Sequence, residues 1–250
     1  MEAQNAAWIF TSATLMVDDN FDHYRNHMGL YNAKTLSLGS PFDYQNQAML
    51  CIPRFLPEPN DRAIKYNLVD IACRLIDASK GRSFILFTSH AMMREVAELV
   101  QEKIDNPILV QGSTTKQALL DEYLKNQNAV LFGTGAFWEG VDVKGNDLLC
   151  VMIDKLPFAS PDDPLLQARI EDCKKQGGNA FAQIQIPKAV ITLKQGAGRL
   201  IRDETDKGVL VICDNRLVTK QYGQTFIASL PNMKRTRSLD AVAAFLNKIE

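Results

Sequence analysis

Near the end of the chain, a glutamine and two arginines have the types and spacing that suit phosphate chemistry. In the run QGAGRLIRDETDKG, residues 195–208, Gln195 is followed by Arg199 and Arg202. On a helix these three side chains share one face, because positions i, i+4 and i+7 lie above one another. Guanidinium groups stabilise the charge on transferring phosphoryl oxygens through forked hydrogen bonds. The spacing therefore raises the question of whose phosphate these arginines would reach.

The chain has no phosphate-binding P-loop of its own. The pattern G-x-x-x-x-G-K-[ST] occurs nowhere in the 250 residues. The segment GVDVKGN, residues 140–146, comes nearest, but Asn146 stands where the pattern needs lysine. A nucleotide that meets the arginines must then be held by another part of the protein.

Composition limits the classes of partner. With 46% apolar and 23% charged residues, the chain can bury one large core or two small ones. Its net charge of -1 argues against a broad basic surface, so nucleic acid would have to bind in a local groove. There is no basic segment at the N-terminus and no apolar run long enough to span a membrane. We expect a cytoplasmic protein without membrane contact.

The cysteines and histidines do not predict a metal centre. None of the five cysteines forms a C-x-x-C pair, and Cys51, Cys150 and Cys213 lie within apolar runs, as buried thiols do. His23 and His27 have the i, i+4 spacing of a helical metal pair, but no glutamate follows the first histidine and no third ligand is evident. We expect no metal ligands in this chain.

Short apolar runs alternate with longer stretches of helical period, which predicts an α/β fold. Strands are predicted at residues 6–13, 48–53, 83–88, 107–111, 128–133, 147–154 and 208–214. Helices are predicted at residues 62–79, 90–104, 115–126, 163–175, 185–201, 215–229 and 238–249. Consecutive apolar positions favour strands covered on both faces, and the alternation favours a mostly parallel sheet with helices on both faces.

In such a sheet, functional loops follow the carboxyl ends of the strands. Polar segments rich in glycine or hydroxyl groups follow five of the predicted strands, at residues 11–14, 88–93, 133–142, 154–164 and 214–217. We therefore expect these segments to gather along one edge of the sheet as a binding surface.

These segments, in this order, resemble the helicase motifs of a known family. They read TSATL, SFILFTSHAMM, LFGTGAFWEGVDVKG, DKLPFASPDDPL and QGAGRLIRDETDKGVLVICDNRL. Together they resemble the second motor domain, helicase domain 2, of an XPD/DinG-type superfamily 2 DNA helicase, closest to the DinG and YoaA branch of bacteria. The resemblance implies one RecA-like domain over residues 1–250. Residues 1–20 would form the junction with a preceding N-terminal motor domain, and residues 21–60 an irregular connection.

In this family ATP with Mg²⁺ is held by a P-loop and a D-E-x-H box in the N-terminal motor domain. Neither motif is present in this sequence. The family's iron–sulfur cluster also belongs to that first motor domain. The resemblance therefore implies that this chain completes an ATP site held elsewhere and is inactive by itself.

The resemblance also implies roles for particular residues. At the nucleotide, Arg202 would act as an arginine finger with Arg199 beside it, and Gln195 would orient the γ-phosphate or the attacking water. Further nucleotide-side residues would be Glu139, Gly140, Asp142 and Gly198. Residues that would touch nucleic acid are Thr88, Ser89, His90, Gly133, Thr134, Gly135 and Lys155, with Pro157 and Phe158 lining the same path. Residues that would couple the two sites are Ser12, Ala13 and Thr14.

Several alternatives remain open from the sequence. Trp138 suits either base stacking or a place in the core, and residues 11–14 suit either coupling or a simple cluster of hydroxyls. The basic run KRTR, residues 234–237, is expected on a solvated face.

The predicted function is the second motor domain of an ATP-dependent DNA helicase of repair or replication, acting at the bacterial nucleoid. Its partners would be single-stranded DNA, its own N-terminal motor domain, and polymerase accessory or single-strand-binding proteins. The alternatives are a non-catalytic docking domain and an RNA translocase domain, since no residue identifies a reader of the 2′-hydroxyl.

Overall fold

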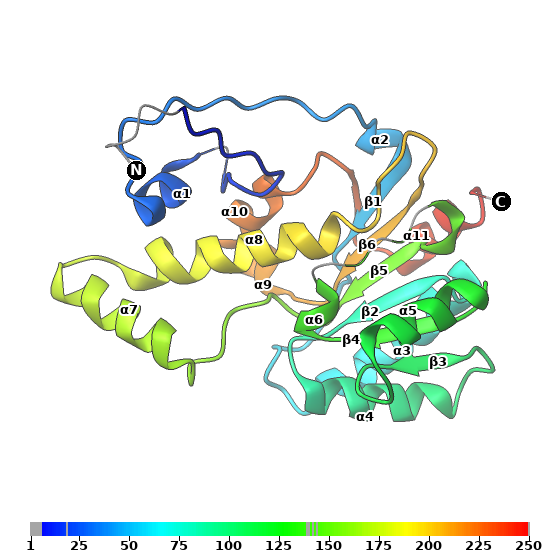
Figure 1. The fold of residues 1–250 in the computed structure, drawn as a ribbon. Helices are drawn as coiled ribbons and strands as arrows, with labels where there is room; N and C mark the ends of the chain where they lie inside the picture. The colour runs from blue at the N-terminus through cyan, green and yellow to red at the C-terminus, as the bar shows by residue number, and fades with distance from the viewer. Residues whose placement is uncertain (1–6, 19, 139–140, 142, 144, 250) are drawn as a thin grey trace.

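The computed structural model describes residues 7–18, 20–138, 141, 143 and 145–249. Within these residues the centre of the molecule is a seven-stranded sheet with the order β3-β4-β2-β5-β6-β1-β7 (Figure 1). All neighbouring strands are parallel. The strands are β1 (Ala48–Cys51), β2 (Ser83–Leu86), β3 (Ile108–Val110), β4 (Val130–Gly133), β5 (Cys150–Ile153), β6 (Gly208–Ile212) and β7 (Lys234–Thr236).

Helices connect the strands. They are α1 (Asp22–Met28), α2 (Tyr44–Gln47), α3 (Ile64–Ser79), α4 (His90–Gln101), α5 (Lys116–Lys125), α6 (Gly135–Trp138), α7 (Pro164–Lys175), α8 (Ile186–Ala197), α9 (Arg216–Thr219), α10 (Gly223–Ser229) and α11 (Leu239–Leu246). A 3₁₀ turn, η1 (Gly145–Asp147), precedes β5, and a π-helical segment, η2 (Phe181–Gln185), leads into α8. Hydroxyl or carboxylate side chains cap the N-termini of α4, α5, α7 and α11.

The two faces of the sheet bury separate cores, because successive side chains of a strand point to opposite sides. Leu131, Val151 and Leu210 belong to a core that includes side chains of α5, α8 and α10. Their neighbours Val130 and Val211 belong to the other core, with α3, α4 and α11. Full burial of each such aliphatic side chain contributes about 1.5–3 kcal/mol. The prediction of a parallel sheet covered on both faces is confirmed.

Six of the predicted strands are present with slightly shorter bounds, but the strand predicted at residues 6–13 is wrong. Its described part has no regular structure, and Ile9 is 85% exposed. An apolar run becomes a strand only where a neighbour accepts its backbone hydrogen bonds, and the edges of this sheet are β3 and β7. Conversely, the run KRTR, expected as a solvated face, contributes the exposed edge strand β7, which pairs with β1.

The helix predicted at residues 185–201 ends at Ala197, so the expectation that Gln195, Arg199 and Arg202 share one helical face is wrong. Gly196 and Gly198 weaken the helix there, at about 1 kcal/mol each relative to alanine. The helix predicted at residues 215–229 is divided into α9 and α10, because Lys220 is extended.

The described residues before β1 contribute no strand to the sheet. Residues 32–40 run without regular structure between α1 and α2, and Figure 1 shows this segment crossing above α8. Figure 1 also shows α7 and the start of α8 projecting away from the sheet. No helix in the described part of the chain is long and apolar enough to cross a lipid bilayer.

Candidate functional site

At the carboxyl ends of β3 and β4, and at the start of α4 beyond β2, three polar side chains form a connected chain. The backbone N–H of Thr134 donates to Gln111 Oε1 at 2.6 Å, and Thr134 Oγ1 lies 3.1 Å from the same oxygen. Thr134 Oγ1 also lies 3.1 Å from Nε2 of His90. Thr134 is 4% exposed, whereas His90 is exposed. The sequence-predicted residues Thr134 and His90 are therefore brought together, with His90 on the outside.

A buried carboxylate joins the ends of β2 and β5. Asp154 Oδ1 accepts the N–H groups of Thr88 and Lys155 at 3.0 and 2.8 Å, and Oδ2 accepts the Thr88 hydroxyl at 3.2 Å. Burial raises the pKa of Asp154 to about 7, although the nearby Lys155 charge and these donors act in the opposite direction. Asp154 thus fixes the loop that carries Thr88 and the backbone of Lys155.

A second buried carboxylate, that of Asp214, connects the end of β6 to the loop after β5. Asp214 accepts the N–H of Leu156 at 2.8 Å and forms an ion pair with Arg216 at 2.6 Å. The Arg216 guanidinium lies 5.4 Å from the ring centroid of Phe158, which stacks with Phe181 at 5.6 Å. Phe158 is half-buried and Phe181 is 37% exposed, so aromatic surface is available on this side of the edge.

The two candidate finger arginines converge on one backbone segment. Arg199 donates to the carbonyl oxygens of Val141 and, at 2.7 Å, Trp138. Arg202 Nη2 donates to the same Val141 oxygen at 2.9 Å. Because two guanidinium groups share one carbonyl, they lie side by side even though neither is on the helix.

The arginine loop, residues 198–207, is held by buried side chains. Asp206 Oδ2 accepts the N–H groups of Arg202 and Asp203 at 2.7 and 2.9 Å, while Oδ1 accepts that of Gly145 at 3.0 Å. Gln47 donates to the carbonyls of Asp203, Glu204 and Asp206. Asp206 and Gln47 are 3% and 5% exposed, so water competes little for these bonds.

The glycine and tryptophan of the segment after β4 have packing roles. A Cβ on Gly133 would lie 2.8 Å from the Cβ of Phe137, so this position excludes larger side chains. Trp138 is 2% exposed, and its indole N–H donates to the Phe87 carbonyl at 3.2 Å. Of the two alternatives for Trp138, the structure therefore supports the core. Gly135 begins α6 with open space around it.

Gln195 and Thr14 line one pocket of about 1230 Å³, between α1, α7 and α8. Thr14 lies in a turn with Ser12 and Ala13. The hydroxyl groups of Thr14 and Ser12 are hydrogen-bonded to each other at 3.2 Å. Lys194 donates to the carbonyl of Met16 at 3.0 Å, which ties this turn to the last part of α8. The predicted coupling residues thus lie beside α8, although no strand precedes them in the described residues.

Of the remaining predicted nucleotide-side residues, Gly198 caps α8 directly before Arg199. Ser89 caps the N-terminus of α4, where its hydroxyl accepts the N–H of Met92. Glu139, Gly140 and Asp142 lie outside the described residues.

The donor groups present suit a phosphate but not an iron–sulfur cluster. Paired guanidinium groups match the forked geometry of phosphoryl oxygens. Burial raises the pKa of Cys51 and of Cys150 to about 12 and raises that of Cys213 well above its ordinary value. The thiols therefore stay protonated, whereas cluster ligands are thiolates. These three cysteines are buried, as predicted. Within the described residues no group of three or more His, Cys, Asp or Glu side chains is placed to hold a metal ion.

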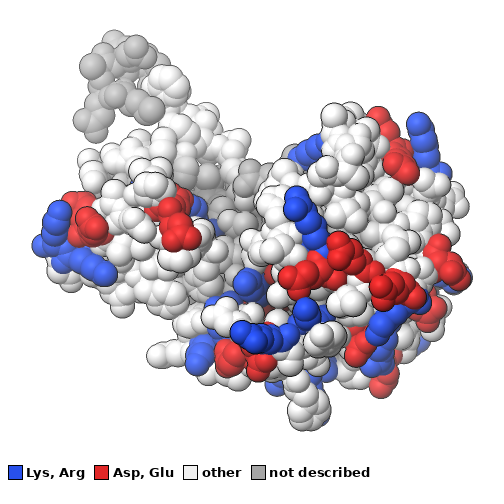
Figure 2. Space-filling view, turned by 90° about the horizontal axis from the view of Figure 1, so that it is seen from below, with Lys and Arg blue, Asp and Glu red and all other residues white. Residues whose placement is uncertain are grey.

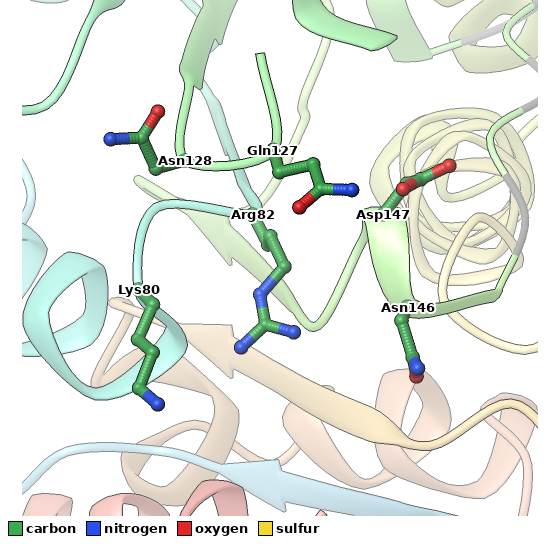
Figure 3. Close-up of a pocket in the computed structure, with 6 residues that line it drawn as sticks. All are labelled: Lys80, Arg82, Gln127, Asn128, Asn146 and Asp147. Atoms are coloured by element: carbon green, nitrogen blue, oxygen red, sulfur yellow. The ribbon is translucent and has the colours of Figure 1, made fainter. Parts of the chain in front are cut away.

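Other surface features lie away from the predicted site. A pocket of about 570 Å³ lies at the amino ends of β2, β4 and β5, opposite to the predicted site (Figure 3). Its lining residues are Lys80, Arg82, Gln127, Asn128, Asn146 and Asp147. None of the predicted site residues lines it. Figure 2 shows lysine and arginine interspersed with aspartate and glutamate on the face drawn, in keeping with the small net charge.

Sequence reasoning singled out none of the residues that hold the polar loops and the arginine loop in place, although Asp154 and Asp214 begin two of the segments expected at the binding edge. The holding residues are Gln111, Asp154, Asp206 and Asp214, together with Gln47. Gln111, Asp154 and Asp214 share one signal, since each follows an apolar strand within two residues. Asp206 precedes β6 and carries no comparable signal.

Comparisons with known proteins agree with this fold and with the family resemblance of the sequence. A family model described as helicase C-terminal domain matches residues 72–233. The ATP-dependent DNA helicase YoaA of Haemophilus influenzae is 55% identical over 246 residues, covering 98% of this chain and 38% of that protein. YoaA of Escherichia coli is 52% identical over 246 residues, covering 98% and 39%. The ATP-dependent helicase DinG of Mycobacterium tuberculosis is 37% identical over 250 residues, covering 98% and 37%.

Among solved structures, an XPD helicase superposes with a TM-score of 0.54 at 20% identity, covering 76% of this chain and 35% of that one. Dbp5 of S. cerevisiae bound to RNA and ADP BeF3 gives a TM-score of 0.57 at 16% identity, covering 92% and 53%. These likenesses establish the RecA-like fold. The chain spans about two-fifths of the length of the YoaA and DinG relatives.

Proposed function

Because the chain belongs to the helicase C-terminal domain family, in the branch of YoaA and DinG, we propose that it is the second motor domain of an ATP-dependent DNA helicase. In this proposal Arg199 and Arg202 reach the γ-phosphate of an ATP, with its Mg²⁺, that is bound by a preceding motor domain. The carboxyl edge of the sheet holds single-stranded DNA. Hydrolysis by this chain alone is negligible, since it has no P-loop.

The convergence of the two guanidinium groups on the Val141 carbonyl is the observation that carries the proposal. A γ-phosphate presents several oxygens that two adjacent guanidinium groups can bind together. Asp206 and Gln47 hold the loop backbone, so little ordering is needed when a phosphate arrives. Such preorganised positive charge stabilises the charge that develops on a transferring phosphoryl group.

The DNA-holding role of the carboxyl edge is supported by its donors and by its connection to the arginines. His90 is exposed at the first turn of α4, where helix N–H groups favour a phosphate, and Ser89 precedes it as the helix cap. Asp154 bonds to the backbone of both Thr88 and Lys155, so the loop after β5 lies next to the loop that leads into α4. The segment from Thr134 to Val141 contacts His90 at one end and both arginines at the other. A shift of that segment on DNA binding would therefore move the carbonyl that the arginines hold.

The test is DNA-stimulated ATP hydrolysis by the full-length protein that contains this chain, comparing Arg202→Ala with wild type. Loss of an arginine finger lowers turnover by about 10³-fold or more, and single-strand binding should stay within about twofold. Lys207→Ala is the matched control, because Lys207 is an exposed cation of the same loop. Arg199→Lys keeps the charge but loses the fork, and should lower turnover by an intermediate factor.

Turnover of Arg202→Ala equal to that of Lys207→Ala would remove the finger assignment. Absence of turnover in the wild type, with DNA present, would favour the docking domain. Equal stimulation by RNA and DNA of the same sequence would replace the DNA proposal with the RNA translocase.

A further inference from the structure

We propose that Gln111 is a positioning residue for the nucleic-acid edge: through Thr134 it fixes the ring orientation and the tautomer of His90. This inference rests on the proposed function, because it assigns His90 to the bound strand. Gln111 follows β3, Thr134 follows β4, and His90 begins α4, so three elements meet in one hydrogen-bond chain.

The direction of each hydrogen bond follows from the groups themselves. The backbone N–H of Thr134 can only donate, so the Gln111 atom at 2.6 Å must be the carbonyl oxygen and not the amide nitrogen. That oxygen can only accept, so the Thr134 hydroxyl at 3.1 Å donates its proton to it. The hydroxyl oxygen is then left as the acceptor for His90 Nε2, which must carry a proton.

This chain has two consequences for the exposed ring. The Thr134 hydroxyl proton is committed to Gln111, so this buried hydroxyl acts on the strand through His90 and not by donating to it directly. The neutral His90 ring carries its proton on Nε2, which leaves Nδ1 as the acceptor of the ring. Without the Gln111 oxygen, the Thr134 proton is free to turn toward His90, and the ring no longer has one preferred tautomer.

The substitution that tests this proposal is Gln111→Met, which keeps the length of the side chain and removes the acceptor oxygen. Gln117→Met is its control, because Gln117 is exposed on α5 and its amide donates to Asp121 on the same helix. In the full-length protein, Gln111→Met should weaken single-strand binding about fivefold, the effect of losing about one hydrogen bond.

A double-mutant cycle tests whether Gln111 acts through Thr134. Thr134→Val and Gln111→Met should each weaken binding, and the double variant should bind about as well as Thr134→Val alone. Full additivity of the two effects would overturn the inference. If His90→Ala and Thr134→Val both leave binding unchanged, the edge does not hold the strand and the proposed function is at fault. If they weaken binding while Gln111→Met behaves like Gln117→Met, only the role of Gln111 fails.

A spectroscopic readout separates positioning from mere stability. With ¹⁵N-labelled histidine in alkaline buffer, where imidazole is neutral, the His90 signals should show a single Nε2–H tautomer in wild type and in Gln117→Met. His90→Gln identifies which signals belong to this ring. In Gln111→Met the two ring nitrogens should move toward averaged shifts. A single unchanged tautomer in Gln111→Met would overturn the inference.

Discussion

The buried carboxylate of Asp206 accepts backbone N–H groups from two segments that are far apart in the sequence. It fixes Arg202 and Asp203 with one oxygen and Gly145 with the other. Bonds from a charged acceptor to backbone donors in a water-poor site are stronger than neutral ones, so the loop has little freedom. The placement of the arginine side chains therefore depends on a residue whose carboxylate bonds to backbone N–H groups and not to a guanidinium.

Asp206→Ala should destabilise the fold by about 2–4 kcal/mol, because it leaves three partly buried N–H groups without their charged acceptor. The urea midpoint measures this loss, and DNA-stimulated turnover should fall as well because the loop moves. Glu204→Ala is the control, since Glu204 is an exposed acid of the same loop. Equal midpoints for the two variants would show that Asp206 does not hold the loop.

Sequence reasoning expected Arg199 and Arg202 to lie together, but on a shared helical face; the structure brings their guanidinium groups together at the Val141 carbonyl, beyond the end of α8. Asp206, Gln47 and Gln111 could not be predicted, because each bonds to backbone or side chains brought near only by the sheet. Gln47 donates to a carbonyl 159 positions away, at Asp206. No local pattern encodes such a partner, whereas a polar residue directly after an apolar strand is a usable signal.

At the scale of the elements, sequence periodicity predicted strands well where both faces are buried. β5 and β6 are consecutive apolar residues, and both were predicted. Residues 7–10, AWIF, are also consecutive apolar residues but lie outside the sheet, because an apolar run does not say whether a neighbouring strand is present. The edge strand β7 shows the reverse case: Lys234 and Arg235 are charged, yet the backbone pairs with β1.

Asp154, which links the ends of β2 and β5, should make the free energy of unfolding depend on pH. The carboxyl of Asp154 titrates near 3.8 when unfolded, and burial raises its pKa to about 7 in the folded protein. Between these values the folded state binds more protons, so unfolding free energy falls as pH rises, by up to about 1.4 kcal/mol per unit. Below the window and above it, this group contributes no slope.

Asp154→Asn should flatten that dependence, because asparagine matches the shape of the protonated acid and does not ionise. The measurement is the urea midpoint between pH 4 and pH 8, with Asp162→Asn as an exposed control. The wild type and the control should lose stability toward pH 7, by an amount on the order of 4 kcal/mol at most. Equal slopes for Asp154→Asn and wild type would contradict the assignment.

At the scale of the whole molecule, one sheet carries two separate clusters. The polar cluster of Gln111, Thr134 and His90 lies at the carboxyl ends of the strands, whereas the arginine loop leads into the start of β6. The segment leaving β4 connects the two, since it contacts His90 and both arginines. Through this segment, a ligand at the polar cluster can influence a ligand at the arginines, but only when both ligands are bound.

The isolated 250-residue chain should therefore show no ATP turnover above background, with or without DNA, because it contains no P-loop. Extending the chain to the full length of its relatives should restore DNA-stimulated turnover. Steady-state phosphate release measures both. Turnover by the isolated chain that Arg202→Ala abolishes would show that the chain binds ATP by itself.

The middle of the sheet is also protected chemically. Cys51, Cys150 and Cys213 lie on or directly after three adjacent strands, and burial keeps their sulfurs protonated. Oxidants and alkylating agents react with thiolates, so these three sulfurs stay inert for as long as the strands remain paired. A chain that loses its sheet exposes all three together, and oxidation of these three sulfurs thus falls on unfolded copies.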